Sequence, residues 1–240
     1  MKNFLKKFLF FITIVISLII VAFIIIKYDA EGEKTLPFSI SKILLVSTVN
    51  GDIVDDPNNI WNINITQVND VYMYIDKTQE TDETIKEIKL EKFIINTMPQ
   101  KGNVKLLRPT GELSNLYTYS EQDYLNSEIV YQGSAIDDMK SLEIANNGGV
   151  LGFRFALDDL GNYISNENQE IIYDGNLLKN LGISLEEIKF SVSFDIIITT
   201  SDDINYKGTI NLEMPIDTII EEGSSHKEIT GLESIVFKRV

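Results

Sequence analysis

The chain has 240 residues, with 21 lysine and arginine side chains against 36 aspartate and glutamate side chains and a formal net charge of -15. It has no cysteine and a single histidine, His226. That composition excludes disulfides, thiolate metal sites, cysteine nucleophiles and any chemistry that needs two histidines. The acidic excess repels phosphate, so we expect no nucleic-acid partner.

The charge is distributed unevenly along the chain. Residues 1–27 contain four lysines and no acidic residue, which leaves residues 28–240 with a charge of -19, four units below the -15 of the whole chain. Residues 8–26 are uncharged, and a helix of that length spans about 28 Å, close to the hydrocarbon thickness of a bilayer. Only Thr13 and Ser17 interrupt the apolar run, and we expect both hydroxyls to bond back to helix carbonyls.

We therefore predict a single transmembrane helix at residues 8–26, which contacts the lipid bilayer. A basic cytoplasmic tail at 1–7 precedes it and a polar linker at 27–35 follows it. Lysines dominate the first flank, whereas acidic residues offset Lys27 on the second. The positive-inside rule then places the N-terminus in the cytoplasm and residues 36–240 outside the cell membrane, with the helix as a signal-anchor. A cleaved signal peptide is the alternative, although the run is long and Tyr28-Asp29-Ala30 is a poor cleavage site.

Residues 36–240 show the alternation that is typical of strands. The clearest case is the stretch 190–198, followed by a polar turn at 200–203 and a second alternating stretch at 209–214, which predicts an antiparallel hairpin. Stretches at 38–49, 68–75, 88–95, 104–107, 151–157 and 235–240 predict further strands, and the run at 71–75 is suited to a strand buried on both faces.

Turn and helix signals complete the pattern. Asn50-Gly51 and the break at 99–103 predict turns, the second within a hairpin, and the phase slip at Glu91-Lys92 predicts a bulge. Residues 176–181, ended by Gly182, predict a short helix, and a capping box from Ser184 predicts another. We predict an extracytoplasmic antiparallel β-sandwich at 36–240, as one domain or as two subdomains divided near the loop at 110–128.

Paired carboxylates are the one repeated reactive feature of the sequence. Glycoside hydrolysis needs two carboxyl groups across a cleft, and adjacent residues on a strand point to opposite faces. We therefore predict no catalytic residue and no enzyme, with an envelope hydrolase as the alternative. The pairs are Asp55-Asp56, Asp137-Asp138, Asp158-Asp159, Glu186-Glu187, Asp202-Asp203 and Glu221-Glu222.

Two acidic loops are candidates for calcium, which binds several oxygen ligands. One contains Asp52, Asp55 and Asp56, and the other contains Asp158 and Asp159. Neither matches the D-x-D-x-D-G pattern, and turns favour the same residue types. We expect no cofactor, with a calcium-stabilised structural domain as a further alternative.

Short motifs along the chain also carry a resemblance. They are FIIN at 93–96, KG at 101–102, RPT at 108–110, YDGNLLKNLGI at 173–183, IIEEG at 219–223 and VFKR at 236–239. With the apolar N-terminal helix, the chain resembles a family of single-pass membrane proteins from clostridia and related Gram-positive bacteria that has no assigned activity. The resemblance implies a location and a source and no catalytic residue. Our functional prediction is a module that binds a protein partner in the cell envelope.

Overall fold

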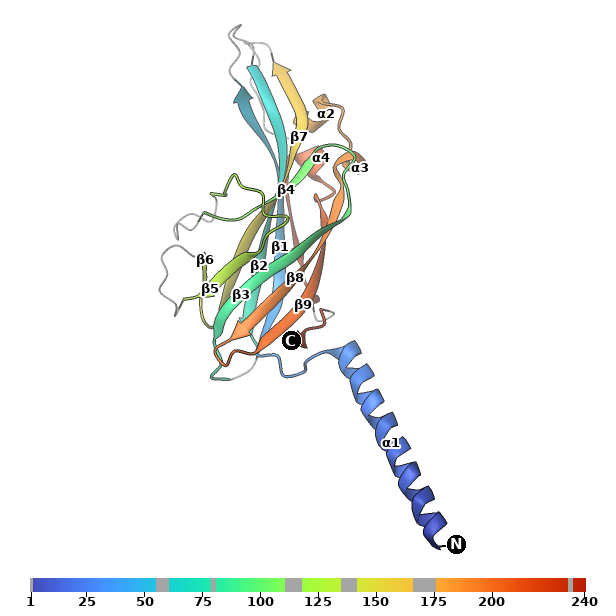
Figure 1. Ribbon diagram of the computed structural model, residues 1–240. Helices are drawn as coiled ribbons and strands as arrows, with labels where there is room; N and C mark the ends of the chain where they lie inside the picture. The colour runs from blue at the N-terminus through green and yellow to red at the C-terminus, as the bar shows by residue number, and fades with distance from the viewer. Residues whose placement is uncertain are drawn as a thin grey trace.

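One long helix precedes a domain built mainly of strands (Figure 1). The computed structural model describes residues 2–54, 61–78, 81–110, 118–134, 142–165, 176–232 and 235–240. The helices are α1 (Lys2–Glu31), α2 (Asn176–Asn180), α3 (Leu185–Ile188) and α4 (Ile219–Glu222). The strands are β1 (Phe38–Val54), β2 (Trp61–Lys77), β3 (Ile85–Thr97), β4 (Asn103–Leu107), β5 (Ile129–Gly133), β6 (Leu142–Ile144), β7 (Gly148–Ser165), β8 (Phe190–Thr200), β9 (Asn205–Met214), β10 (Ser224–Ile229) and β11 (Lys238–Arg239).

α1 is long and apolar enough to cross a membrane, and its described side chains are exposed all round. A helix with apolar side chains on every face is typical of a membrane span or of a buried core helix. Thr13 Oγ1 donates to the Leu9 carbonyl at 3.0 Å and Ser17 Oγ donates to the Thr13 carbonyl at 2.9 Å, which confirms the predicted back-bonding. The helix continues to Glu31, so residues 27–31, which we expected in the linker, are helical.

The strands form two sheets. One has the order β10-β1-β2-β7-β4 and is antiparallel throughout, and the other has the order β11-β9-β8-β3-β5-β6, with β5 and β6 parallel. Each sheet contains strands from both sides of segment 110–128, so the chain does not divide there into two separate sheets. The described parts of that segment, residue 110 and residues 118–128, lie outside the strands, as predicted for a loop.

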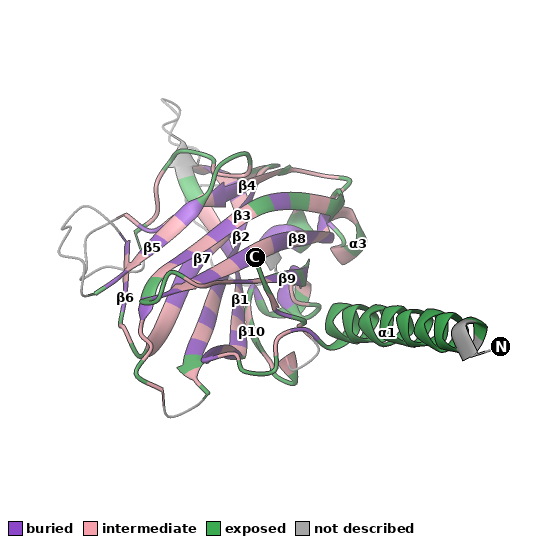
Figure 2. Cartoon of the chain, turned by 60° about the horizontal axis from the view of Figure 1, so that its bottom comes forward, coloured by how far each residue is buried: buried purple, intermediate pink, exposed green. Residues whose placement is uncertain are grey.

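Side chains from both sheets meet in one apolar core. Along β8 every second residue from Phe190 to Thr200 is buried, and Figure 2 shows the same alternation on neighbouring strands. Phe194 of β8 stacks on Phe93 of β3 with centroids 5.2 Å apart, and it meets Phe153 of β7 edge-on at 5.5 Å. A smaller core lies where β1, β2 and β7 extend past the second sheet and pack on the short helices α2, α3 and α4.

Several local predictions are confirmed. The β8–β9 hairpin has the predicted faces and turn. The register between β3 and β8 shifts after Glu91, and Lys92 has a positive φ of 56°, as the predicted bulge requires. The Glu187 carboxylate accepts from Ser184 N–H and Oγ, each at 2.8 Å, at the start of α3.

Three other predictions are wrong. Asn50-Gly51 does not turn, because β1 continues through it in register with β2, and this pairing outweighs the local turn preference. Residues 99–103 do not close a hairpin, since β3 belongs to one sheet and β4 pairs with β7 in the other. The run at 71–75 of β2 is not buried on both faces, because Tyr72 and Tyr74 are partly exposed while the residues that alternate with them are buried. Residues 67–71 of the same strand are all buried.

Candidate functional site

The end of α1 is fastened to the C-terminal segment of the chain. Glu33 N–H donates to the Phe237 carbonyl at 2.7 Å, and the Tyr28 hydroxyl accepts from Arg239 N–H at 2.9 Å. Lys238 Nζ lies 2.8 Å from Asp29 Oδ1. Because Phe237 is buried in the core and β11 pairs with β9, these contacts attach the helix to an edge of the second sheet.

Gly32 makes this attachment possible. Its φ is +70°, a left-handed conformation that glycine tolerates. A Cβ at this position would lie 2.4 Å from the Phe237 carbonyl oxygen and 2.8 Å from Val236 Cγ1. The helix end and the C-terminal segment therefore approach more closely than another residue type allows.

We expect Gly32→Ala to loosen the junction. The left-handed backbone alone costs about 1–2 kcal/mol with a side chain, and the Cβ contacts add to that cost. The absence of native cysteines allows spin labels at Lys27→Cys and Ser191→Cys, and Gly32→Ala should broaden the distance distribution between them. Gly182→Ala is the matched control, because Gly182 has a φ of +66° and no atom within 4 Å of the added Cβ. An unchanged distribution in Gly32→Ala would contradict a junction held by these contacts.

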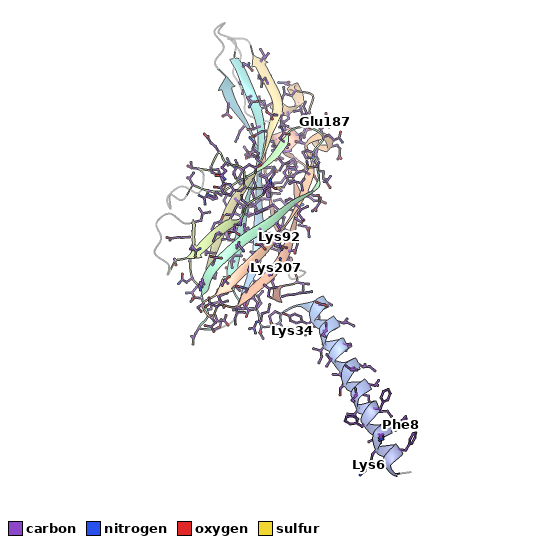
Figure 3. All side chains as sticks on the ribbon, viewed as in Figure 1. Lys6, Phe8, Lys34, Lys92, Glu187 and Lys207 are labelled. Atoms are coloured by element: carbon purple, nitrogen blue, oxygen red, sulfur yellow. The ribbon has the colours of Figure 1, made fainter. Side chains whose placement is uncertain are left out.

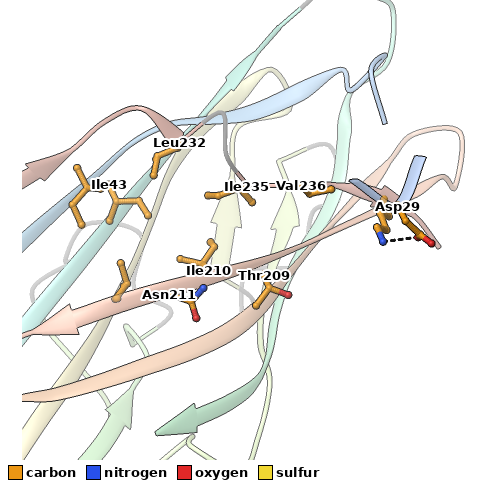
Figure 4. Close-up of a pocket in the computed structure, with 11 residues that line it drawn as sticks. Asp29, Ile43, Thr209, Ile210, Asn211, Leu232, Ile235 and Val236 are labelled. Atoms are coloured by element: carbon orange, nitrogen blue, oxygen red, sulfur yellow. Dashed lines mark hydrogen bonds and ion pairs between the residues drawn. The ribbon is translucent and has the colours of Figure 1, made fainter. Parts of the chain in front are cut away.

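A groove of about 520 Å³, lined mainly by apolar residues, lies beside this junction (Figure 4). It separates β1 and β10 of one sheet from β9 of the other, and the segment between β10 and β11 also contributes to it. The ion pair of Asp29 and Lys238 stands at one end, so the groove begins at the last turn of α1. Its polar lining residues are Asp29, Thr209, Asn211 and Lys238. Its apolar lining residues are Ile43, Ile210, Leu212, Ile229, Leu232, Ile235 and Val236.

β9 borders the groove with a largely open edge. β8 pairs with one side of β9 along its whole length. β11 pairs with the other side only at Tyr206 and Lys207. Beyond Lys207, no strand in the described part of the chain covers that side.

The backbone direction identifies which groups face the open edge. Val240 N–H donates to the Asn205 carbonyl at 3.0 Å, so the backbone of Asn205 points towards the β11 side. Backbone groups alternate between the two sides along an antiparallel strand. Thr209, Asn211 and Glu213 therefore direct their N–H and C=O groups to the same side, where they are available to another strand.

An ion pair and a hydrogen bond connect the outer face of β9 to β8. Lys207 Nζ and Thr209 Oγ1 each lie 2.7 Å from a carboxylate oxygen of Asp195 on β8. Burial alone would raise the pKa of Asp195, but the hydrogen bonds from Lys207 and Thr209 lower it below its ordinary value. Figure 3 labels Lys207 and Lys92 on this part of the domain, and Lys92 Nζ lies 3.8 Å from Asp195. These contacts hold the side chains of Lys207 and Thr209 against Asp195 on the outer face of the sheet.

A second polar cluster lies on the opposite face of the β2–β7 pair from the core. The Arg154 guanidinium donates to both carboxylate oxygens of Asp70, at 2.6 and 2.8 Å, and the Tyr119 ring lies 4.1 Å from its Cζ. Burial lowers the pKa of Arg154, but the hydrogen bond and charge of Asp70 raise it further, so the net shift is upward. Burial raises the pKa of the Tyr119 hydroxyl. This pair joins two strands and the loop that carries Tyr119.

The calcium candidates do not converge on one site in the described residues. Asp52 is exposed on β1, and Asp55 and Asp56 lie outside the described residues. Asp158 forms an ion pair with Lys105 at 2.6 Å, and Asp159 accepts from Asn103 at 2.7 Å. Within the described ranges, no three acidic or histidine side chains are grouped to hold a metal ion.

The carboxylate pairs that the structure describes lie on four different elements, β7, α3, the β8–β9 turn and α4. Asp137-Asp138, like Asp55-Asp56, lies outside the described residues. At least one member of each described pair is held by a neighbour: Asp158 by Lys105, Glu187 by Ser184, Asp203 by Lys86 and Glu221 by Lys179.

The sequence did not reveal the groove. The alternation at 209–214 predicts that Ile210 and Leu212 face inward, which they do, but it does not show that β9 has an open edge.

The architecture defines the class of this protein as a mainly β domain of two sheets that follows one apolar helix long enough to span a membrane. No protein-family model, curated protein or solved structure matches the chain significantly.

Proposed function

We propose that the protein is a membrane-tethered binding module. In this proposal α1 spans the cell membrane once with its N-terminus in the cytoplasm, and the two sheets form an extracytoplasmic β-sandwich. The groove beside β9 binds a protein partner of the cell envelope. The observation that carries the proposal is the apolar groove at the junction, bordered by the open edge of β9.

Three further features support it. The contacts of Tyr28 and Asp29 with the C-terminal segment hold the groove at a fixed position relative to the helix end. Lysines before the apolar run favour a cytoplasmic N-terminus. The charge of -19 in residues 28–240, four units below the chain total of -15, favours a basic partner over an anionic polymer.

Cysteine chemistry in intact cells tests this function. A membrane-impermeant maleimide should label Asn211→Cys without permeabilisation and label Lys2→Cys only after it. A benzophenone maleimide on Asn211→Cys should then give a discrete crosslinked protein on illumination.

Thr97→Cys is the control for that crosslink, because Thr97 is exposed on β3 of the same sheet, away from the groove lining. Equal crosslinking from both positions, or none from Asn211→Cys, would count against a partner at the groove. Labelling of Lys2→Cys in sealed cells would reverse the proposed topology.

A further inference from the structure

The open edge of β9 carries backbone donors and acceptors that only another polypeptide backbone can pair completely. Thr209, Asn211 and Glu213 direct N–H and C=O groups to this edge, and none of the described strands pairs with them. Exposed strand edges of this kind pair with added strands. An acyl chain would fill the apolar groove but leave these groups unpaired, so the edge selects a polypeptide.

The groove on one face of the second sheet and the outer surface on the other determine which side chains such a strand would carry. Successive side chains of a strand point to opposite faces. One set would enter the groove beside Ile210 and Leu212 and meet Ile43, Ile229 and Ile235, all of which are apolar. This set must therefore be apolar.

The other set would lie on the outer face, beside the exposed Thr209, Asn211 and Glu213. Asp195 already has Lys207 as a partner, whereas Glu213 forms no ion pair with any residue that the structure describes. Its free carboxylate, on a strongly acidic domain, favours lysine or arginine on the added strand.

We infer that the groove binds an extended polypeptide segment with alternating apolar and basic residues, which adds to the second sheet as a strand next to β9. This inference rests on the proposed function, because it names the chemistry of the partner at the same groove. The added strand would run along β9 from Gly208 to Met214, beyond the reach of β11.

The test uses the full-length protein in lipid nanodiscs and the labelled, end-capped peptide Val-Lys-Val-Lys-Val-Lys-Val, with binding followed by fluorescence anisotropy. Asn211→Pro removes an edge N–H that makes no bond to β8, and proline is tolerated on edge strands in this position. We expect Asn211→Pro to weaken binding by about tenfold or more, since the added strand would lose a hydrogen bond and meet the proline ring. Asn211→Thr, which keeps the N–H, should bind as the unmodified protein does.

A peptide with the same side chains but N-methylated at alternate residues repeats the test without altering the protein, and it should also lose binding. This arm holds even if Asn211→Pro lowers the thermal midpoint of the domain. Unchanged binding of the N-methylated peptide, or of Asn211→Pro, would overturn strand addition.

Leu232→Arg separates this inference from the proposed function, because it places a charge in the groove and leaves the β9 edge intact. If Leu232→Arg lost binding while Asn211→Pro kept it fully, the peptide would bind in the groove without pairing to β9 as a strand. No binding of the peptide together with a crosslink from Asn211→Cys would likewise overturn the inference and keep the groove as the partner site. Self-association of the protein that Asn211→Pro abolishes would make a second copy the occupant and overturn the basic peptide as the ligand.

Discussion

Replacement of Arg154 by leucine should lower the free energy of unfolding by about 3–5 kcal/mol, because it leaves a buried carboxylate without its cation. Asp70 is only 8% exposed, and both of its oxygens accept hydrogen bonds from Arg154. The Tyr119 ring covers the guanidinium, so the variant also removes one of the contacts between residues 118–128 and the sheet.

Urea unfolding of the full-length protein in detergent, followed by circular dichroism, measures this loss. The double variant Asp70→Asn with Arg154→Leu should recover a large part of it, since it removes the uncompensated charge as well. Lys86→Met is the surface control: its ion pair with Asp203 is exposed on both sides, and its loss should change stability little. An Arg154→Leu variant as stable as Lys86→Met would show that the Asp70 carboxylate is not buried.

The features that were predictable from the sequence depend on residues close together in the chain. The helix of residues 8–26 follows from composition alone, and the back-bonding of Thr13 and Ser17 follows once the helix is assumed. The β8–β9 hairpin needs only two alternating stretches and the turn between them. Each of these signals lies within a short stretch of sequence.

The features that were missed depend on which distant strands become neighbours. Asn50-Gly51 has a strong local turn preference, but pairing with Thr66 and Ile65 keeps it extended. Asp70 and Arg154 are 84 residues apart, and neither residue alone indicates a bidentate pair.

The groove is the clearest such case. Its apolar walls come from β1, β9, β10 and the segment before β11, which are widely separated in sequence. The alternation at 209–214 predicts that Ile210 faces inward, but it does not show whether another strand lies beside β9. The open edge of β9 exists because β11 is short, and strand length in the last few residues has no strong sequence signal.

Phe194→Ala should be nearly as costly as the loss of Arg154, at about 3–5 kcal/mol, because the phenyl ring is buried and the cavity cannot fully collapse. Phe194 is 1% exposed, and its ring contacts Phe93 of its own sheet and Phe153 of the other. The ring therefore contributes both to the packing within one sheet and to the packing between the two.

Urea unfolding again gives the measurement, and the denaturant slope should stay unchanged if only stability is lost. Phe194→Leu should cost clearly less, because it keeps most of the apolar volume. Ile94→Ala is the exposed control on the neighbouring strand, since Ile94 is 58% exposed and should change stability little. If Phe194→Ala lowered the free energy of unfolding as little as Ile94→Ala, the aromatic contacts of Phe194 would not stabilise the packing of the two sheets. The packing that sets the distance between β1 and β9 across the groove would then need another explanation.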